Sequence, residues 1–245
     1  VSGKGTPDLV LLPPCQPAVY SRLWKYQVPY LSRHFRVVVM DPRGNGRSDR
    51  PLTGFDFDTR YGDLLAVLGE TVRPPFALVA FGCASMLAVR YAVDHPGHLG
   101  QLILAGAQYA QSLPRPFEDR VAAVIRNDFD GWRQRLFRNI YPEPHSLKGI
   151  EDGIAWAGET SPDVLVEALG QIEKDDVYDL LGRIRVPTLV LHGTQDRIVP
   201  YTHGEKFAAA EVRTSALHMA SAARRVALAK SRADSWREKV EKAAK

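Results

Sequence analysis

The stretch that decides the fold is FALVAFGCASM, residues 76–86. Residues 76–80 form an uninterrupted apolar run, which is typical of a short strand buried on both faces. Residues 86–92 continue as a helical pattern, so the chain must turn sharply in between. Such a turn requires small residues two positions before and after its tip, and Ala80 and Ala84 meet that requirement if Gly82 is the tip. The stretch therefore predicts a strained strand–turn–helix unit with glycine at its tip.

A turn of this kind normally exposes the tip side chain as a nucleophile, and Gly82 has no side chain. Two neighbouring side chains are alternative nucleophiles. If Cys83 were the tip, the bulky Phe81 would occupy the tight side of the turn. Ser85 would lie about one helical turn further on, pointing away from the tip. We therefore expect Gly82 to mark a vacant nucleophile position.

Five segments, taken in order, resemble the α/β-hydrolase superfamily. The resemblance covers nearly the whole chain and implies a mainly parallel, doubly wound α/β sheet, the α/β-hydrolase fold, with a helical cap insertion. Residues 29–51 and 141–146 are similar to an actinobacterial subgroup of that superfamily, some of whose members are fused to other catalytic domains. The five segments are LVLLPPC at 9–15, FRVVVMDPRGNGRSD at 35–49, the turn with RYAVDHP at 90–96, VPTLVLHGTQDRIVP at 186–200, and ALH at 216–218.

The resemblance implies a role for each matching position. Gly82 stands where the family has its nucleophilic serine, Asp196 where it has the triad acid, and His218 where it has the triad histidine. The backbone N–H groups of Cys15 and Cys83 match the donors of the oxyanion hole, which binds a developing negative charge. A His–Asp pair without a serine can still act as a general base. Asp196 can alternatively serve only to shape its own loop by local hydrogen bonds.

Several departures from the family pattern fall on these roles. Pro13 and Pro14 replace the His-Gly of the oxyanion motif, and Ala216 replaces a glycine before the histidine. The segment between Pro200 and His218 is also short. We expect two helical turns over 204–210 and a brief strand over 211–215, which would leave His218 displaced from the family position.

The two cysteines are expected to lie close together, because both follow strands that end at one edge of the sheet. We expect them to pack as small apolar side chains. A disulfide or a thiol site also fits, whereas two ligands make a poor metal site. No metal and no cofactor is predicted. The expected pocket lies between the carboxyl edge of the sheet and the cap, and is lined by Cys15, Phe81, Cys83, Trp132 and Trp156.

The domain organisation follows from alternating strands and helices. Short apolar runs predict core strands near 10–12, 36–40, 76–80, 101–105 and 188–192. Residues 108–182 interrupt this alternation with helical periods and prolines, where the family inserts its cap. We therefore expect one α/β core formed by 1–107 and 183–245, with a cap of 108–182 that depends on the core for burial.

Composition and charge narrow the class of protein. With 45% hydrophobic and 24% charged residues, the 245-residue chain is ordinary for a globular domain. No apolar run approaches the ~20 residues that span a bilayer, and residues 1–5 do not begin a signal peptide. Two cysteines are too few for a disulfide framework, so we expect a reducing, cytoplasmic compartment in a bacterium. The net charge is +4. The basic residues of 224–245 suggest either a membrane- or nucleic-acid-binding helix or a solvated terminal helix, and mixed charges favour the latter.

Three functional classes follow from these observations. The favoured one is a small-molecule-binding pseudo-hydrolase that has lost its nucleophile, with neither nucleic acid nor a membrane as partner. The second is a lyase, cyclase or water-mediated hydrolase that uses His218 and Asp196 as general base and the backbone donors as oxyanion hole. The third is a serine hydrolase inactivated at Gly82 by substitution. A fused or separate catalytic domain is a further expected partner.

Overall fold

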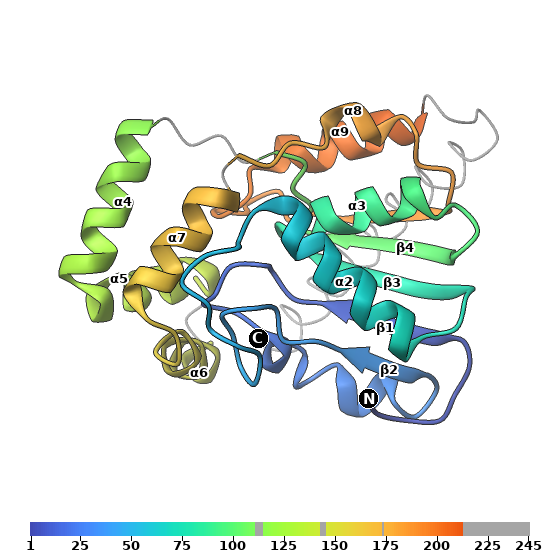
Figure 1. The fold of residues 1–245 in the computed structure, drawn as a ribbon, viewed down its shortest axis with the longest axis horizontal. Helices are drawn as coiled ribbons and strands as arrows, with labels where there is room; N and C mark the ends of the chain where they lie inside the picture. Colours follow the sequence, from blue (N-terminus) through green and yellow to red (C-terminus); the bar gives the residue numbers. More distant parts are fainter. Residues whose placement is uncertain (111–114, 143–145, 173, 213–245) are drawn as a thin grey trace, which may run out of the picture.

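A computed structural model of the protein describes residues 1–110, 115–142, 146–172 and 174–212 (Figure 1). Its centre is a sheet of five parallel strands in the order β2-β1-β3-β4-β5. The predicted α/β class with a parallel sheet is confirmed, and all five expected strands are present. The strands are β1 (Asp8–Leu12), β2 (Arg36–Val39), β3 (Phe76–Phe81), β4 (Leu99–Ala105) and β5 (Thr188–Leu191).

Helices cover both faces of the sheet. One face carries the largest apolar cluster, to which α2 (Phe57–Thr71), α3 (Ala84–Asp94), α8 (Tyr178–Leu181) and α9 (Tyr201–Val212) all contribute. The 3-10 helix η1 (Ser21–Trp24) and α1 (Val28–Leu31) pack on the other face through a smaller cluster around Trp24. The sheet is therefore doubly wound, with strand residues alternating between the two clusters.

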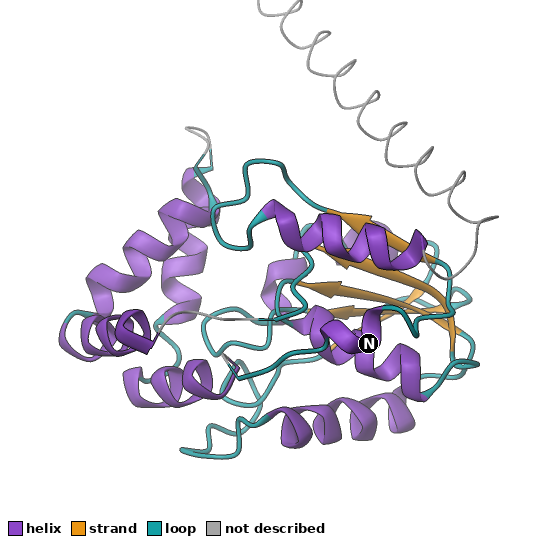
Figure 2. Ribbon diagram, turned by 90° about the horizontal axis from the view of Figure 1, so that it is seen from above, coloured by secondary structure: helices purple, strands orange, loops and turns teal. Residues whose placement is uncertain are grey.

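Four helices between β4 and β5 lie beyond the carboxyl ends of the strands, as Figures 1 and 2 show. We call these four helices the insertion: α4 (Arg115–Asn127), α5 (Phe129–Ile140), α6 (Leu147–Ala157) and α7 (Pro162–Ile172). They bury Ile125, Phe137 and Leu165 in a common cluster that also takes Ala18 and Val19 from the loop after β1. Because Ala18 and Val19 belong to that cluster, the insertion packs directly against the loop that follows β1.

Polar contacts fasten the insertion to the same loop. The Tyr20 hydroxyl donates to Glu159 Oε2 over 2.6 Å, and Arg22 Nη1 lies 2.9 Å from Glu159 Oε1. Lys25 pairs with Asp152 on α6. α8 falls within the expected cap range 108–182, yet it packs on α3 and α9 beside the sheet. The insertion that overhangs the strand ends is thus α4 to α7.

The chain after β5 differs from expectation. The predicted strand over 211–215 is wrong at its start, because α9 continues as a helix to Val212. Residues 204–212 keep helical hydrogen bonding, to which the three alanines 208–210 are suited. His218 and the basic segment 224–245 lie outside the described residues. No helix in the described ranges has the length and apolarity that crossing a bilayer demands.

Candidate functional site

The turn between β3 and α3 lies at the point where the sheet reverses its winding. From β1 the chain proceeds to β2 on one side and then returns to β3 on the other. The loops after β1 and β3 therefore lead to helices on opposite faces of the sheet, and both begin at its carboxyl edge. Ligand sites of open α/β sheets form at this position. The topology alone thus marks the Cys15 and Gly82 segments as the candidate site.

Gly82 occupies the tip of that turn in a left-handed conformation, with φ at +59°. Its N–H donates to the Ala105 carbonyl over 3.0 Å, and its own carbonyl accepts the Ser85 N–H over 3.0 Å. The first bond fixes the tip to the end of β4, and the second starts α3. Ala80 and Ala84 are buried on either side, as the spacing rule predicted. Glycine suits this position because it adopts positive φ without a Cβ penalty.

The tip nevertheless has room for a side chain. A Cβ placed on Gly82 would meet Pro14 Cγ at 3.7 Å and Pro14 Cβ at 3.9 Å, which are ordinary contact distances. Packing does not demand glycine here, so the strain of positive φ is the cost of any other residue. In this chain the tip presents no group able to attack a substrate.

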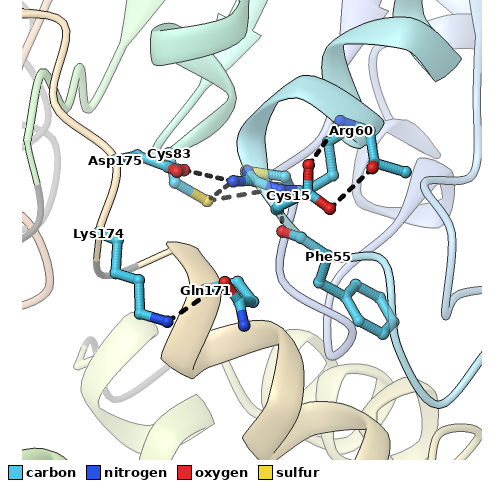
Figure 3. A network of polar contacts seen from close by, with 9 residues as sticks. Cys15, Phe55, Arg60, Cys83, Gln171, Lys174 and Asp175 are labelled. Atoms are coloured by element: carbon cyan, nitrogen blue, oxygen red, sulfur yellow. Dashed lines mark hydrogen bonds and ion pairs between the residues drawn. The ribbon is translucent and has the colours of Figure 1, made fainter.

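Cys15 and Cys83 lie side by side, the second directly after the tip residue (Figure 3). Their Sγ atoms are 3.1 Å apart, and the Cys15 N–H donates to Cys83 Sγ over 3.2 Å. The side chains are buried, at 3% and 4% exposure. Parallel pairing explains the contact: Leu12 is opposite Ala80, and each cysteine follows three positions later. In this geometry the N–H of Cys15, an expected oxyanion donor, is already bonded to sulfur.

A buried arginine adjoins the two sulfurs, and sequence reasoning missed it. Arg60 Nη1 lies 3.4 Å from Cys15 Sγ, its Nε donates to the Phe55 carbonyl over 2.6 Å, and its Nη2 lies 2.5 Å from Asp175 Oδ2. The Arg60 and Asp175 side chains are each only 3% exposed. The sequence did contain a sign of this buried charge, because Arg60 lies on the apolar face of α2 together with Leu64 and Leu68. A charge at such a position needs a buried partner.

The electrostatics of this cluster favour a negative charge on one sulfur. The pKa of Cys83 is lowered first by the thiol hydrogen bond from Cys15, and also by the Cys15 N–H and the Arg60 charge. The pKa of Cys15 is raised because its thiol donates to Cys83 and because it is buried. Burial raises the pKa of Asp175, against the attraction of Arg60. Of the two thiols, Cys83 is therefore the one that gives up its proton more readily.

Asp196 lies in the loop after β5, at the same edge of the sheet. Its Oδ1 accepts the N–H groups of Ile198 and Val199 over 2.8 and 2.9 Å, which is the expected loop-shaping arrangement. Its Oδ2 lies 3.7 Å from His192 Nε2 and 3.5 Å from where a Cβ on Gly106 would stand. The carboxylate is thus beside the end of β4. Its expected partner, His218, falls outside the described part of the chain.

The three aromatic residues expected to line a pocket each pack on a different neighbour. Phe81 meets Trp24 edge to face, with ring centroids 6.3 Å apart, on the η1 face of the sheet. Trp156 meets Tyr20 edge to face, also at 6.3 Å. Trp132 stacks on Phe129 within the insertion, at 6.0 Å. The structure therefore distributes these rings around the loop after β1 and the insertion.

Two hollows among the described residues adjoin this region. A void of about 20 Å³ lies beside Cys15 and Arg60, with walls that include Pro13 and Ala84. A polar cleft of about 380 Å³ opens where β2 ends, between Arg47 and Glu159. No group of three or more His, Cys, Asp or Glu side chains in the described ranges is arranged to hold a metal.

Comparisons with known proteins agree with this fold. The AB hydrolase superfamily protein YisY of Bacillus subtilis (strain 168) is 28% identical, over 74% of this chain and 71% of that protein. The non-heme chloroperoxidase of Streptomyces lividans is 29% identical, over 70% and 68% respectively. Among solved structures, a hydrolase from Pseudomonas aeruginosa PA01 superposes with a TM-score of 0.74 at 25% identity, covering 84% of this chain and 80% of that one.

A bromoperoxidase from Bacillus anthracis superposes with a TM-score of 0.75, covering 85% of this chain and 81% of the other; at 24% identity it supports the fold alone. The family model described as alpha/beta hydrolase fold matches residues 8–228. The chain belongs to the alpha/beta hydrolase fold family.

Proposed function

We propose that this protein binds a small molecule at a hydrolase-type site that performs no serine acyl-enzyme chemistry. The observation that carries the proposal is Gly82 at the tip of the turn, where φ is +59°. An acyl-enzyme needs an oxygen or sulfur nucleophile at this tip. Glycine stands in place of the family serine and offers only hydrogen. The proposed site lies where this fold binds its ligands, at the carboxyl edge between β1 and β3, but it cannot form a covalent acyl-enzyme.

The proposed ligand is a small apolar carboxylate or lactone. The N–H of Cys83 lies at the N-terminus of the eleven-residue helix α3, where the helix dipole favours a negatively charged or carbonyl oxygen. Pro14 faces the tip and supplies an apolar wall. Phe81, Trp132 and Trp156 are proposed to line the approach from the insertion. A molecule with one carbonyl or carboxylate group and an otherwise apolar skeleton fits one backbone donor surrounded by apolar side chains.

The test of the covalent step uses the full reduced protein. A fluorophosphonate probe and a p-nitrophenyl ester burst assay should both be negative, with an intact serine esterase as positive control. Stoichiometric labelling at Cys83 or Ser85, located by peptide mapping, would overturn the proposal. A thermal-shift screen of small carboxylates and lactones should raise the melting temperature for members of that class.

A second candidate function is favoured by the place of Asp196. Its Oδ2 remains outside the two loop-shaping hydrogen bonds and lies beside Gly106 at the edge of the sheet. With His218 against it, the pair would form a general base for a lyase, a cyclase or a water-mediated hydrolase. The N–H of Cys83 would then stabilise the developing oxyanion, and the N–H of Cys15 would join it by giving up its hydrogen bond to Cys83 Sγ.

Two substitutions separate the candidates. If the pair is a base, His218→Ala and Asp196→Asn should each lower turnover of lactones and esters by ~10²–10⁴ while leaving ligand binding nearly intact. The exposed His34→Ala and Asp163→Asn serve as matched controls and should change neither. Absence of any turnover by the unaltered protein, together with measurable ligand binding, would exclude the second candidate.

A further inference from the structure

We propose that Cys15 and Cys83 are a reversible redox pair, which hydrogen peroxide converts to a disulfide joining the loop after β1 to the start of α3. The geometry carries this proposal. The Sγ atoms are 3.1 Å apart, and both cysteines follow paired strands at equivalent positions. A disulfide bond measures ~2.05 Å, so the sulfurs need to approach by only about 1 Å. No rearrangement of the sheet is required.

The surroundings of the pair make one sulfur a nucleophile. Cys83 Sγ accepts both the thiol and the N–H of Cys15, and Cys83 directly precedes α3, whose N-terminus favours negative charge. Arg60 adds a buried positive charge 3.4 Å from Cys15 Sγ. Positive charges and helix N-termini make a cysteine reactive where an oxidant can reach it, whereas buried structural cysteines are inert, so access decides the case. The lowered pKa of Cys83 agrees with this arrangement.

The burial of the two thiols limits the size of the oxidant that can reach them. Both thiols are buried, but a void of about 20 Å³ is lined by Cys15, Arg60 and Ala84, so an oxidant in it lies beside Cys15 and next to the residue that follows Cys83. A cavity of this size holds about one water molecule. Hydrogen peroxide is little larger than water, so it is the oxidant that suits the void. The void is lined by both an apolar residue, Leu87, and the charged Arg60.

The chemistry balances with peroxide as the oxidant. The Cys83 thiolate attacks one peroxide oxygen, the O–O bond breaks, and hydroxide leaves, which gives a sulfenic acid on Cys83. Cys15 sulfur then attacks Cys83 sulfur, the S–O bond breaks, and the Cys15 proton leaves with the departing oxygen as water. The hydroxide takes a proton from solvent. The two sulfurs lose two electrons, and one peroxide is reduced to two waters.

Oxidation would change the candidate site next to the pair. A disulfide sulfur is a weaker acceptor than a thiolate, so the hydrogen bond from the Cys15 N–H to Cys83 Sγ would weaken. The charge of Arg60 is then balanced by Asp175 alone among the groups of this cluster. This pair therefore links the redox state of the chain to the donor geometry at Gly82, independently of which ligand the site takes.

The experiment treats the full reduced chain with graded hydrogen peroxide and then alkylates it with N-ethylmaleimide after denaturation. We expect both cysteines to resist alkylation together, the intact mass to fall by two hydrogen atoms, and non-reducing peptide mapping to find Cys15 joined to Cys83. Dithiothreitol should restore both thiols. Persistence of two alkylatable thiols, or sulfinic acid on either cysteine without the cross-link, would overturn the proposal.

Two variants assign the roles. Cys15→Ser should stop at a Cys83 sulfenic acid that dimedone traps, because the resolving thiol is absent. The combined Arg60→Met and Asp175→Leu substitution replaces the buried ion pair without leaving a single unpaired charge. It should slow peroxide oxidation by ~10-fold, because the thiolate loses its neighbouring positive charge. An unchanged rate in this variant, or dimedone trapped on Cys15 in Cys83→Ser at the same rate, would refute the assignment of Cys83 as nucleophile.

Discussion

Placing serine or alanine at position 82 should leave the protein folded, with a modest loss of stability. Sterically the tip is open, because a Cβ would stand 3.7 Å from the nearest atom, Pro14 Cγ. The cost comes from the backbone, where φ is +59°. A residue other than glycine in this region costs ~1–2 kcal/mol. For a chain of this length ~1 kcal/mol lowers the melting temperature by 2–4 °C, so the expected decrease is ~2–8 °C.

The assay is differential scanning fluorimetry of the full reduced chain, with Gly46→Ala as the matched control. Gly46 has a similar φ of +50°, but a Cβ there would stand 2.3 Å from Asp41 Oδ2. Asp41 accepts the N–H groups of Ser21 and Arg47, so moving its carboxylate breaks those bonds as well. Gly46→Ala should therefore destabilise clearly more than Gly82→Ala. Equal losses would refute the claim that the tip is open, and a raised melting temperature in Gly82→Ala would refute the claim of strain.

Three further predictions concern stability. Arg60→Met should lower the free energy of unfolding by ~3–5 kcal/mol in urea titration, because it strands the buried carboxylate of Asp175, and adding Asp175→Leu should recover most of it. Burial raises the pKa of Asp175 in the folded protein above its value in the unfolded chain. Protonated Asp175 therefore adds to the free energy of unfolding below the unfolded pKa, and this addition is lost as the pH rises through the folded pKa. The melting deficit of Arg60→Met should therefore shrink between about pH 7 and about pH 4, and a deficit that grows would contradict this sign. Gly153→Ala should lower stability by ~1–3 kcal/mol, because its Cβ would overlap the Phe137 ring. Gly170→Ala, on the open surface of α7, should raise stability by up to ~1 kcal/mol, and thermal melts measure both changes.

Much of the fold was predictable because each buried parallel strand is visible as a short apolar segment of the sequence. Each of the five strands coincides with an apolar run that needs no partner to be recognised. The closeness of Cys15 and Cys83 was also predictable, since parallel pairing carries Leu12 and Ala80 forward in register. These inferences need only the composition of a segment and the regular geometry of the sheet.

The contacts that decide the chemistry were less accessible. Arg60 and Asp175 are 115 positions apart, and no local pattern names the partner of a buried charge. Strand alternation places Phe81 with Ala77 and Val79 on the η1 face, a parity that the sequence contained, and its place in the expected pocket stays a prediction. The strand predicted from residue 211 failed because α9 continues to Val212 through residues that favour a helix.

The geometry also argues against Cys83 as a nucleophile acting in place of residue 82. A nucleophile of this fold must stand at the tip with its reactive atom facing the ligand. Cys83 Sγ instead faces Cys15, accepts two hydrogen bonds from it, and belongs to a side chain only 4% exposed. In the proposed redox reaction a small oxidant enters by the void beside Cys15 and Arg60, which an ester is too large to enter. Reactivity toward peroxide combined with inertness toward fluorophosphonate is therefore the pattern that this arrangement of Gly82 and Cys83 requires.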